Sequence, residues 1–477
     1  MSPIIVWFRQ DLRLADNPAL IHAAASGQPL LCIYILDDET PGRWRLGAAA
    51  RWWLHQSLSA LGRELALLGG CLVLRRGTAE TVVPAVVREI SAGAVAWNRC
   101  YEPYAVARDN ELKSRLAQAG IEVTSCNGAL LAEPWEIASK AGTPFRVFTP
   151  FWKTLRQREF PCPTPAPRLL KFFAGPVASD ALAEWRLPPR APDWAEGFRV
   201  HWTPGEAGAA AALDDFVARA VDYPALRDRP DLVATSRLSP HLHWGELSPR
   251  QLWHAVRANA YELPDEGEKY LSELAWREFA HHLLYHFPAL PDEPLDPSFA
   301  NFPWTDDSVA FAEWSKGQTG IPIVDAGMRE LWQTGWMHNR VRMIAASFLT
   351  KHLMIPWQRG EAWFWDTLLD ADLANNAAGW QWVAGCGADA APFFRIFNPV
   401  LQGEKFDPEG DYIRRFVPEL TGLSARHIHR PWQAPATALA EAGLRLGRDY
   451  PLPIVDLAAR RARALAAFRG RKPARKG

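Results

Sequence analysis

The chain of 477 residues is long enough for two or three domains with large hydrophobic cores. Its 53 Lys and Arg residues balance 53 Asp and Glu residues, so overall charge does not indicate a nucleic-acid-binding protein, and any DNA site must be a local patch. The six cysteines form no CxxC pair or disulfide framework, which is typical of reduced thiols in a cytoplasmic protein. We expect no membrane partner, because no apolar stretch is long enough to span a bilayer and residues 1–11 resemble a first strand rather than a signal peptide.

The first 130 residues alternate between short apolar runs and helical patterns. Buried strands are predicted at 3–8, 30–36, 71–77, 94–99 and 121–126. Helices are predicted between them at 17–25, 46–68, 79–91 and 105–119. This alternation predicts an α/β domain with a five-stranded, parallel, doubly wound sheet. No GxGxxG motif follows the first strand, so the dinucleotide fingerprint is excluded, although a ligand could lie at the carboxyl ends of the strands.

Residues 131–204 contain twelve prolines and cannot form much regular structure. We predict an interdomain connector here, with short helices such as 150–158. From residue 205 helical periodicity dominates and strand signals nearly disappear, which predicts an all-α domain over 205–477. Its helices are predicted at 208–220, 249–258, 268–285, 325–334, 341–351, 361–370 and 373–383. The predicted organisation is therefore an α/β domain at 1–130, a connector and a helical domain.

The stretch 365–398 has an unusual pattern of polar and aromatic residues. Asp372, Asn376 and Trp380 recur at i, i+4 and i+8, which on a helix places a carboxylate, an amide and an indole in one stripe. Such a stripe suits a large, flat heteroaromatic ligand with polar edges. The alternative is an ordinary buried helix whose polar groups cap neighbouring turns.

Two further motifs could carry chemistry. The segment TSRLSP at 235–240 offers hydroxyls, backbone N–H groups and a guanidinium before a helix, which could hold a pyrophosphate or could simply cap that helix. Glu273 and Trp276, at i and i+3, point in one direction from their helix, although Arg277 could form a plain ion pair with Glu273. The histidine pairs lack a completing ligand cluster, so we expect structural histidines and no metal site.

Several segments together resemble the photolyase/cryptochrome family. They are LLDADLANNAAGWQW followed by FFRIFNP, VWFRQDLRLADNPAL at 6–20, TSRLSPHLHWGELSP at 235–249, SELAWREF at 272–279 and WMHNRVRMIAASFLTKHLMIPW at 336–357. The resemblance covers nearly the whole chain and is strongest to bacterial photolyases that repair cyclobutane pyrimidine dimers. It implies an N-terminal antenna-chromophore domain and a C-terminal domain that binds FAD and DNA.

The resemblance implies an FAD site in the helical domain. The cofactor-binding residues it implies are Tyr223, Thr235, Ser236, Arg237, Leu238, Ser239, Arg342, Asp370, Ala371, Asp372 and Asn376. Arg342 is the implied partner of Asp370. Asn376 is expected to face flavin N5, where its amide can donate or accept a hydrogen bond, whereas an aspartic acid would supply a proton.

The resemblance also implies a lesion pocket and a path for electrons. Trp276 and Trp382 are expected to wall a pocket for a flipped-out dimer, with Glu273 bonding the lesion. The implied catalytic residues are Glu273, Trp276, Asn339, Met343, Asn376 and Trp382. The implied DNA-binding residues are Arg227, Glu273, Trp276, Arg277, Asn339, Arg340, Arg395 and Gln402. The implied electron-transfer chain is Trp304, Trp357 and Trp380. Positions 339 and 343 are not histidines, which opposes (6-4) repair.

Family members carry a second, antenna chromophore, either methenyltetrahydrofolate, 8-hydroxy-deazaflavin or another flavin. The Asn-Glu pair of the known folate pattern is replaced here by Tyr104 and Ala105, which favours a deazaflavin or a differently built folate site. We expect residues 42–53 to line it.

The implied activity is light-driven repair of cyclobutane pyrimidine dimers by electron transfer from photoexcited reduced FAD to a flipped-out dimer. UV-damaged DNA is the expected partner, and we expect a monomer. The alternatives are a cryptochrome, opposed by Asn376 and by the short chain beyond the helical core, and a light-independent flavin oxidoreductase, which would need a nicotinamide fingerprint. The basic tail 460–477 is either solvated or a nonspecific DNA arm.

Overall fold

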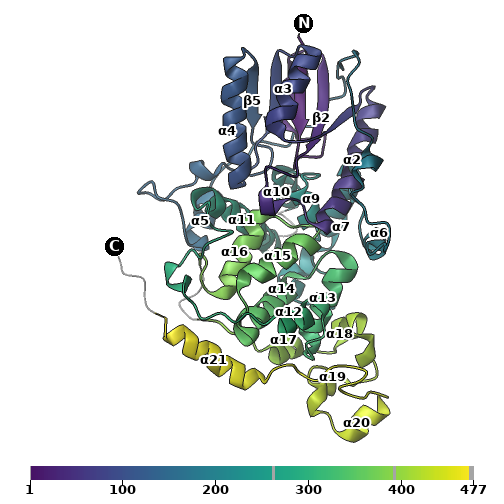
Figure 1. Ribbon diagram of the computed structural model, residues 1–477, viewed down its shortest axis with the longest axis vertical. Coiled ribbons are helices and arrows are strands. Elements are labelled where there is room, and N and C mark those ends of the chain that lie inside the picture. Colours follow the sequence, from purple (N-terminus) through teal and green to yellow (C-terminus); the bar gives the residue numbers. More distant parts are fainter. Residues whose placement is uncertain (1, 260–263, 390–393, 472–477) are drawn as a thin grey trace. The chain divides into compact units, whose positions relative to one another are not determined.

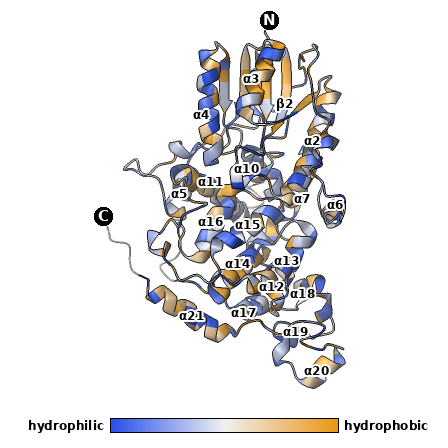
Figure 2. Ribbon diagram, in the orientation of Figure 1, coloured by the Kyte–Doolittle hydropathy of each residue, from blue (hydrophilic) through white to orange (hydrophobic). Residues whose placement is uncertain are grey.

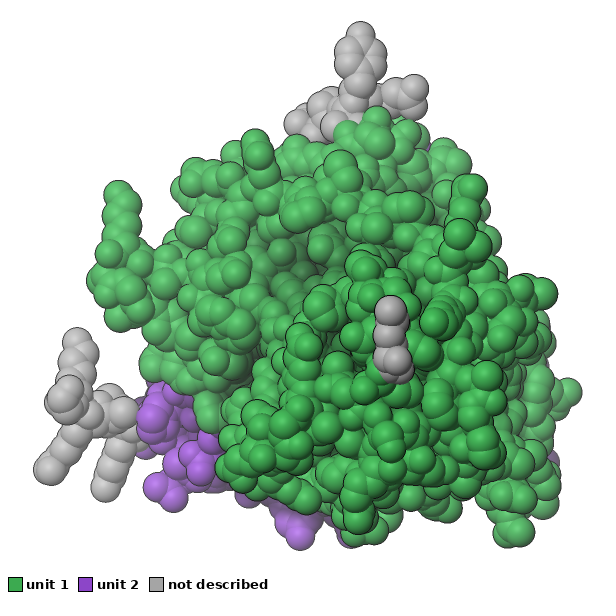
Figure 3. Space-filling model, turned by 90° about the horizontal axis from the view of Figure 1, so that it is seen from above, with its two compact units in different colours: residues 1–221, 236–288, 369–374 green, residues 222–235, 289–368, 375–477 purple. Residues whose placement is uncertain are grey.

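The computed structural model describes residues 2–259, 264–389 and 394–471. They form two compact units, which Figure 3 distinguishes by colour. Unit 1 comprises residues 1–221, 236–288 and 369–374, and unit 2 comprises residues 222–235, 289–368 and 375–477. The predicted domain boundaries at residues 130 and 204 stay predictions.

Unit 1 contains a parallel sheet with strand order β3-β2-β1-β4-β5 (Figure 1). Its strands are β1 Ile4–Phe8, β2 Leu30–Leu36, β3 Leu72–Arg76, β4 Ala94–Asn98 and β5 Glu122–Cys126. Side chains of β1, β2 and most of β4 are buried, as expected for central parallel strands that helices cover on both faces. Figure 2 accordingly shows hydrophobic strands beside a largely hydrophilic helix α4. The predicted α/β fold with a five-stranded parallel sheet is confirmed.

Four helices accompany the sheet: α1 Pro18–Ala25, α2 Ala48–Leu67, α3 Ala79–Ile90 and α4 Pro103–Gln118. Helix α1 begins after Asn17, whose side chain accepts a hydrogen bond from the backbone N–H of Leu20, while Pro18 occupies the first helical position. Trp7 of β1 lies opposite Trp97 of β4, and both join a core with the valines of α3. The local sequence therefore determines where the helices start. The apolar strands, which alternate with helices along the chain, form the core.

The Pro-rich connector belongs to unit 1 and contains η2 Pro134–Glu136, α5 Phe148–Leu155, η3 Leu182–Trp185 and α6 Glu196–His201. It follows the β3 side of the sheet, where Phe173 N donates to Leu30 O and Asp180 N donates to Leu74 O. The connector therefore covers a strand edge that would otherwise expose unpaired backbone groups. The remaining elements of unit 1 are η1 Gly42–Trp44, α7 Glu206–Arg219, α9 Ser239–His243, α10 Pro249–Ala258 and α11 Pro264–His286.

The regular elements of unit 2 within the residues that the structure describes are all helices. Its longer helices are α12 Ser308–Lys316, α13 Pro322–Thr334, α14 Asn339–Ser347, α15 Trp357–Thr367, α16 Leu373–Ala384, α17 Pro399–Phe406 and α21 Leu457–Arg469. The first two residues of α16 are grouped with unit 1. Shorter elements are α8 Tyr223–Leu226, η5 Pro297–Phe299, α18 Asp411–Phe416, η7 Pro418–Leu420, α19 Ala425–Ile428, η8 Pro431–Gln433 and α20 Ala436–Glu441; η4 Ala220–Asp222 spans the unit boundary.

Two helices of unit 2 end earlier than predicted. The helix predicted at 341–351 ends at Ser347 and continues as a π-helix, η6 Phe348–Leu353. The helix predicted to end at residue 370 ends at Thr367, because Leu368 adopts an extended backbone conformation. None of the helices within the described ranges is long and apolar enough to cross a membrane.

Candidate functional site

Helix α16 carries the central polar residues of the site. It begins at Leu373, so Asp372 directly precedes the helix, and the predicted three-residue helical stripe is wrong at that end. Asn376 and Trp380 do share one face, four residues apart, and both are buried. The side-chain Nδ2 of Asn376 donates to Glu361 O of α15 at 3.0 Å, which fixes the amide while leaving its second N–H and its oxygen to other partners.

Asp372 lies between two buried histidines of unit 1. Its Oδ2 is 3.3 Å from His281 Nε2 and 3.6 Å from His243 Nδ1. Burial alone would raise the pKa of Asp372, but the two histidines outweigh it and hold that pKa well below its ordinary value. Burial would lower the pKa of His281, yet the Asp372 carboxylate outweighs it and raises that pKa. The site therefore holds a buried carboxylate, and sequence reasoning missed His281 because only the fold brings it to Asp372.

The loop before α9 is polar and constrained. Arg237 adopts a left-handed backbone conformation with φ 53°, and its guanidinium lies 4.5 Å from the Trp202 ring centre. Ser236 Oγ accepts hydrogen bonds from Tyr270 O–H at 2.8 Å and from Leu238 N at 3.3 Å. Helix α9 starts at Ser239, so the predicted helix start after this loop is present, although the helix has only five residues.

The remaining predicted cofactor residues lie on both units. Tyr223 and Thr235 belong to unit 2, where buried Tyr223 starts α8 and the Arg227 guanidinium lies 5.6 Å from its ring centre. Arg342, also in unit 2, donates through Nε to Met337 O at 2.7 Å. Asp370 and Ala371 are buried residues of unit 1. The pairing of Arg342 with Asp370 stays a prediction.

Helix α11 presents Trp276 with one ring face backed by a second aromatic side chain. Trp276 is half-buried and stacks on Phe148, with ring centres 3.8 Å apart and planes inclined by 7°. Phe148 is the first residue of α5 and is itself buried. This parallel stack covers one face of the indole and fixes its orientation. No local pattern pointed to Phe148, since it lies in the connector, far from Trp276 in sequence.

Glu273 and Arg277 of α11 do not pair with each other. Glu273 accepts from Lys269 Nζ at 3.0 Å. Arg277 donates to Ala129 O at 2.9 Å and to Glu278 at 3.3 Å, rather than forming the alternative ion pair with Glu273. Burial raises the pKa of Glu278 to about 7, partly offset by Arg277 and His281. Glu278 is thus a buried titratable group, and sequence reasoning missed it.

The predicted lesion and DNA residues of unit 2 lie largely at its surface. Asn339 is exposed at the start of α14, and Met343 is half-buried one turn later. Arg340 donates to Asp228 at 2.6 Å, and its guanidinium lies 4.6 Å from the Phe406 ring centre. Further along the chain, Trp382 is half-buried on α16, Arg395 is exposed, and Gln402 is half-buried on α17.

The indole of Trp380 is enclosed by close neighbours. A Cβ added to Gly360 would lie 2.1 Å from Trp380 Cη2, so glycine at this position of α15 lets the ring approach the helix. The ring centres of Phe364 and Trp314 are 5.0 Å and 6.2 Å from that of Trp380. Trp357 is buried at the start of α15.

The other predicted electron-transfer residue, Trp304, is half-buried next to Phe302, with ring centres 4.5 Å apart. A second run of aromatic rings leads away from Trp380. It passes from Trp314 to Phe311 at 5.7 Å, to Trp363 at 6.3 Å and to the exposed Trp332 at 6.4 Å. Sequence reasoning missed this run because its members come from three separate helices.

The carboxyl ends of β1 and β4, where the strand order reverses, contain a polar network of the chain's own side chains. Arg9 Nη1 donates to Asp109 at 2.6 Å. Asn98 Nδ2 donates to Asp11 at 2.6 Å and to Asn17 at 2.7 Å. These groups occupy the crevice in which open α/β sheets commonly bind ligands.

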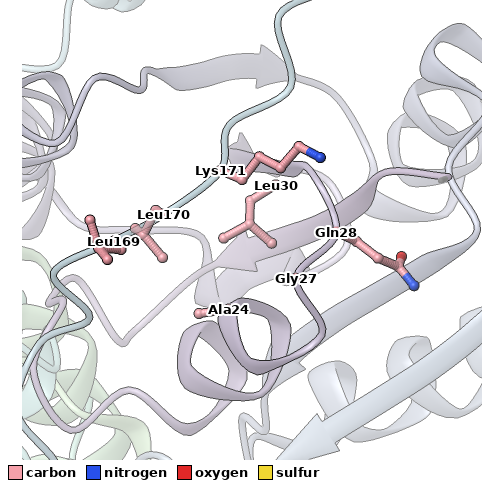
Figure 4. A pocket seen from close by; sticks show the side chains of 7 residues that line it. All are labelled: Ala24, Gly27, Gln28, Leu30, Leu169, Leu170 and Lys171. Atoms are coloured by element: carbon pink, nitrogen blue, oxygen red, sulfur yellow. The ribbon is translucent and has the colours of Figure 1, made fainter.

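Two other places in unit 1 could hold a ligand. Beyond the carboxyl end of β2, the Arg43 guanidinium of η1 lies 4.4 Å from the ring centre of Trp44. A pocket of about 220 Å³ lies at the amino end of β2 (Figure 4). Ligand pockets typically measure about 300–1,000 Å³, so the pocket in Figure 4 is small for a chromophore.

Within the residues that the structure describes, no group of three or more His, Cys, Asp and Glu side chains could hold a metal ion. The paired histidines instead make contacts within the chain, such as His241 Nδ1 with Glu246 at 2.5 Å and His282 Nδ1 with Pro134 O at 3.1 Å. Unit 1 therefore offers buried carboxylates and imidazoles, and unit 2 offers a buried amide and buried indoles, which are groups that suit organic ligands with polar edges.

Comparison with known proteins assigns the chain to a family. Residues 4–168 match the family described as DNA photolyase, and residues 270–470 match the FAD binding domain of DNA photolyase. A deoxyribodipyrimidine photo-lyase from Agrobacterium fabrum is 51% identical, with 98% of each chain covered. Cryptochrome-1 from Arabidopsis thaliana is 39% identical, covering 96% of this chain and 69% of the cryptochrome. The chain belongs to the photolyase/cryptochrome family, as predicted.

Comparison with solved structures supports the same family assignment. A bacterial class III photolyase from Agrobacterium tumefaciens has a TM-score of 0.96 at 50% identity, with 98% of each chain covered. An archaeal photolyase from Sulfolobus tokodaii with two FAD molecules has a TM-score of 0.83 at 29% identity, covering 98% of this chain and all of that chain. The higher identity and fuller coverage of the Agrobacterium photolyases favour the predicted repair enzyme over the cryptochrome alternative.

Proposed function

We propose that this protein repairs cyclobutane pyrimidine dimers in DNA, with FAD as its catalytic cofactor and light as its energy source. The observation that carries the proposal is the 51% identity to a deoxyribodipyrimidine photo-lyase over 98% of both chains. Bound FAD, when reduced and illuminated, supplies the electron that opens the cyclobutane ring. The residues of this chain bind, orient and electrostatically support that reaction.

The residues fit an FAD molecule in their chemistry. His243 is buried, and its Nε2 has no hydrogen-bond partner among the described residues, so a ligand with polar edges could satisfy it. Its neighbour Asp372 has a pKa well below the ordinary value and is ionised at neutral pH, so it can accept hydrogen bonds from such a ligand. We propose that Ser236, Arg237 and Ser239 hold the phosphates.

Asn376 is the residue we propose to face the flavin ring. Its bond to Glu361 O leaves one N–H and the amide oxygen for the ligand. An amide has no titratable proton, so it can hydrogen-bond a negatively charged ring without protonating it. This property suits a repair enzyme.

We propose that a lesion pocket receives the flipped-out dimer. Trp276, backed by Phe148, offers one free indole face for a flipped base, and extrusion of a damaged pair costs least because its pairing is already weakened. Glu273, Asn339, Met343 and Trp382 are proposed to contact the lesion. Arg227, Arg277, Arg340, Arg395 and Gln402 are proposed to contact the DNA backbone around it.

A second chromophore is proposed on unit 1, near residues 42–53. Two features support this: a photolyase from Sulfolobus tokodaii has a structure with two FAD molecules, and a cation–aromatic pair of Arg43 and Trp44 follows β2. Mass spectrometry of the extracted pigment would distinguish methenyltetrahydrofolate, 8-hydroxy-deazaflavin and a flavin. We also propose a cytoplasmic monomer, in keeping with six free cysteines.

The test combines a spectrum with a repair assay. The purified protein should show bound FAD and should restore dimer-containing oligonucleotides only under near-UV or blue light. Asn376→Asp should retain FAD, but flavin reduction under blue light should stall after one electron and repair should fall at least severalfold. Burial raises a carboxyl pKa, so the introduced acid can donate its proton.

The matched control is Asn375→Asp, which makes the same change at the preceding position of α16 and should repair like wild type. A protein that binds dimer DNA but never repairs it under light would contradict the proposal. Wild-type repair by Asn376→Asp would show that Asn376 does not face the flavin.

A further inference from the structure

The carboxyl-terminal segment 457–471, called here the basic segment, is not used by the proposed function. It comprises α21 followed by Gly470 and Arg471. The segment contains five arginines and no acidic residue, whereas the whole chain is neutral. A net charge of +5 is therefore concentrated in fifteen residues, and the other residues carry the opposite net charge.

The segment is a helical element held against other parts of unit 2. Phe468 stacks on Phe394, with ring centres 4.4 Å apart and planes inclined by 18°. Arg463 donates to Thr305 Oγ1 at 2.8 Å, and the Arg471 guanidinium lies 4.1 Å from the Phe468 ring centre. The same guanidinium lies 4.7 Å from the ring centre of Phe299, outside the segment, so two of the five arginines help to fix the segment in place.

The other three arginines remain available to a partner. Arg461 and Arg469 are exposed, and Arg460 is half-exposed. Among the described residues none of the three forms an ion pair, unlike exposed arginines elsewhere in unit 2 such as Arg445, which lies 3.2 Å from Asp449. Their charge is therefore not neutralised within the protein and can attract an anion.

The anchor places the segment beside a proposed DNA contact. Phe394, on which Phe468 stacks, is followed directly by the exposed Arg395. A 13-residue helix is about 20 Å long, and duplex DNA carries one phosphate charge per ~1.7 Å of its axis. DNA seated on Arg395 could thus continue along the basic segment over several base pairs.

We propose that the basic segment is a second, sequence-independent DNA-binding surface, which contacts phosphates of duplex DNA flanking the lesion. Its arginines are spread around the helix rather than aligned on one face, which suits phosphates and not the reading of bases. This inference rests on the proposed function only through the placement of DNA at Arg395. The segment would hold the protein on undamaged duplex and increase its local concentration near lesions.

The test uses the full protein with FAD bound and an undamaged 40-base-pair duplex. The triple variant R460Q/R461Q/R469Q should bind this duplex about tenfold more weakly at 50 mM salt. Its slope of log affinity against log salt should be shallower by about one to three units, since each lost phosphate contact removes about 0.9. The variant R460K/R461K/R469K should retain the wild-type slope, because it keeps the charges.

The matched control is R426Q/R445Q/R448Q, which removes three exposed charges elsewhere in unit 2 and should leave the salt slope unchanged. R460Q/R461Q/R469Q and R426Q/R445Q/R448Q should both repair a dimer in a short single strand like wild type, because the segment is proposed to contact only the duplex that flanks the lesion. Absence of repair by wild type would contradict the proposed function and not this inference.

Equal salt slopes for wild type and R460Q/R461Q/R469Q would overturn the inference. Unchanged duplex binding together with lost binding to phosphatidylserine vesicles would also overturn it, and would assign the segment to a membrane surface instead.

Discussion

The regions around Trp276 on α11 and Trp380 on α16 place the same side chain in opposite surroundings. Trp276 is half-buried and has one ring face backed by Phe148. Trp380 is 3% exposed and is enclosed by Gly360, Phe364 and Trp314. A backed but accessible ring can stack on a base, whereas an enclosed ring can only exchange electrons or fill a core. The surroundings therefore separate a binding wall from an electron relay.

The largest effect should come from the relay. Trp304→Phe keeps most of the ring volume but replaces indole with a ring that is much harder to oxidise, so packing should survive. We expect the rate at which illuminated FAD is reduced by an external reductant to fall by more than tenfold, as measured by absorption. The same variant, reduced chemically beforehand, should repair dimers normally.

The second aromatic run makes this test sharper. If Trp304→Phe keeps a substantial rate that disappears when Trp314→Phe is added, the electrons reach Trp380 through Trp314. A wild-type rate in the double variant would show that neither run carries electrons to the flavin.

Loss of the Trp276 ring should lower the affinity for damaged DNA. Trp276→Ala removes a stacking surface worth roughly 1–3 kcal/mol per base, so the affinity for dimer-containing DNA should fall about tenfold or more. FAD content should not change. Unaltered affinity in a fluorescence-anisotropy titration would contradict the assignment of Trp276 to the lesion pocket.

Enclosure of Trp380 can be tested at glycine positions. Gly360→Ala places a Cβ 2.1 Å from the Trp380 ring, and such overpacking typically costs about 1–3 kcal/mol, more than the ~1 kcal/mol that alanine gains in a helix. The matched control is Gly379→Ala on α16, where a Cβ meets nothing within 4 Å and stability should rise by up to ~1 kcal/mol. Equal stability changes in urea unfolding would show that the ring is not enclosed as described.

The backing of Trp276 should have a smaller effect than the wall itself. Phe148→Leu fills much of the same space but removes the parallel ring stack, which is worth about 0.5–1.5 kcal/mol beyond burial. We expect a two- to fivefold loss of affinity for dimer DNA. A loss equal to that of Trp276→Ala would mean that Phe148 contacts the lesion directly.

On the buried side of α11, the expected effect is on the pH dependence of stability and not on DNA binding. Burial raises the pKa of Glu278 to about 7 in the folded protein, above its unfolded value of about 4.5. The folded state then binds more protons than the unfolded state between these values, so stability falls as the pH rises through that window. Glu278→Gln should remove this dependence, which amounts to about 2 kcal/mol between pH 5 and pH 7.5, when urea unfolding is compared at these two values. Parallel pH profiles for both proteins would show that Glu278 does not titrate there.

Local sequence patterns determined much of the secondary structure. The strand predicted at 30–36 and the helix predicted at 249–258 have the same bounds in the structure. The reason is local: β2 is a continuous apolar run, and α10 begins with a capping box of Ser248 and Gln251. The helix that starts after residue 372 was also predicted. The predicted helical stripe of Asp372, Asn376 and Trp380 included one residue too many, because Asp372 precedes the helix.

The roles of the site residues came from the family resemblance, and they stay predictions. The sequence by itself could place Trp276, Asn376 and Trp380 on helices, because helical spacing is local. Only the tertiary structure set Phe148 against Trp276, Gly360 against Trp380, and Asp372 between His243 and His281. These contacts join residues far apart in sequence, so no periodicity or cap encodes them. They arise when the chain packs, and they decide which ring is accessible, which is enclosed and which carboxylate stays ionised.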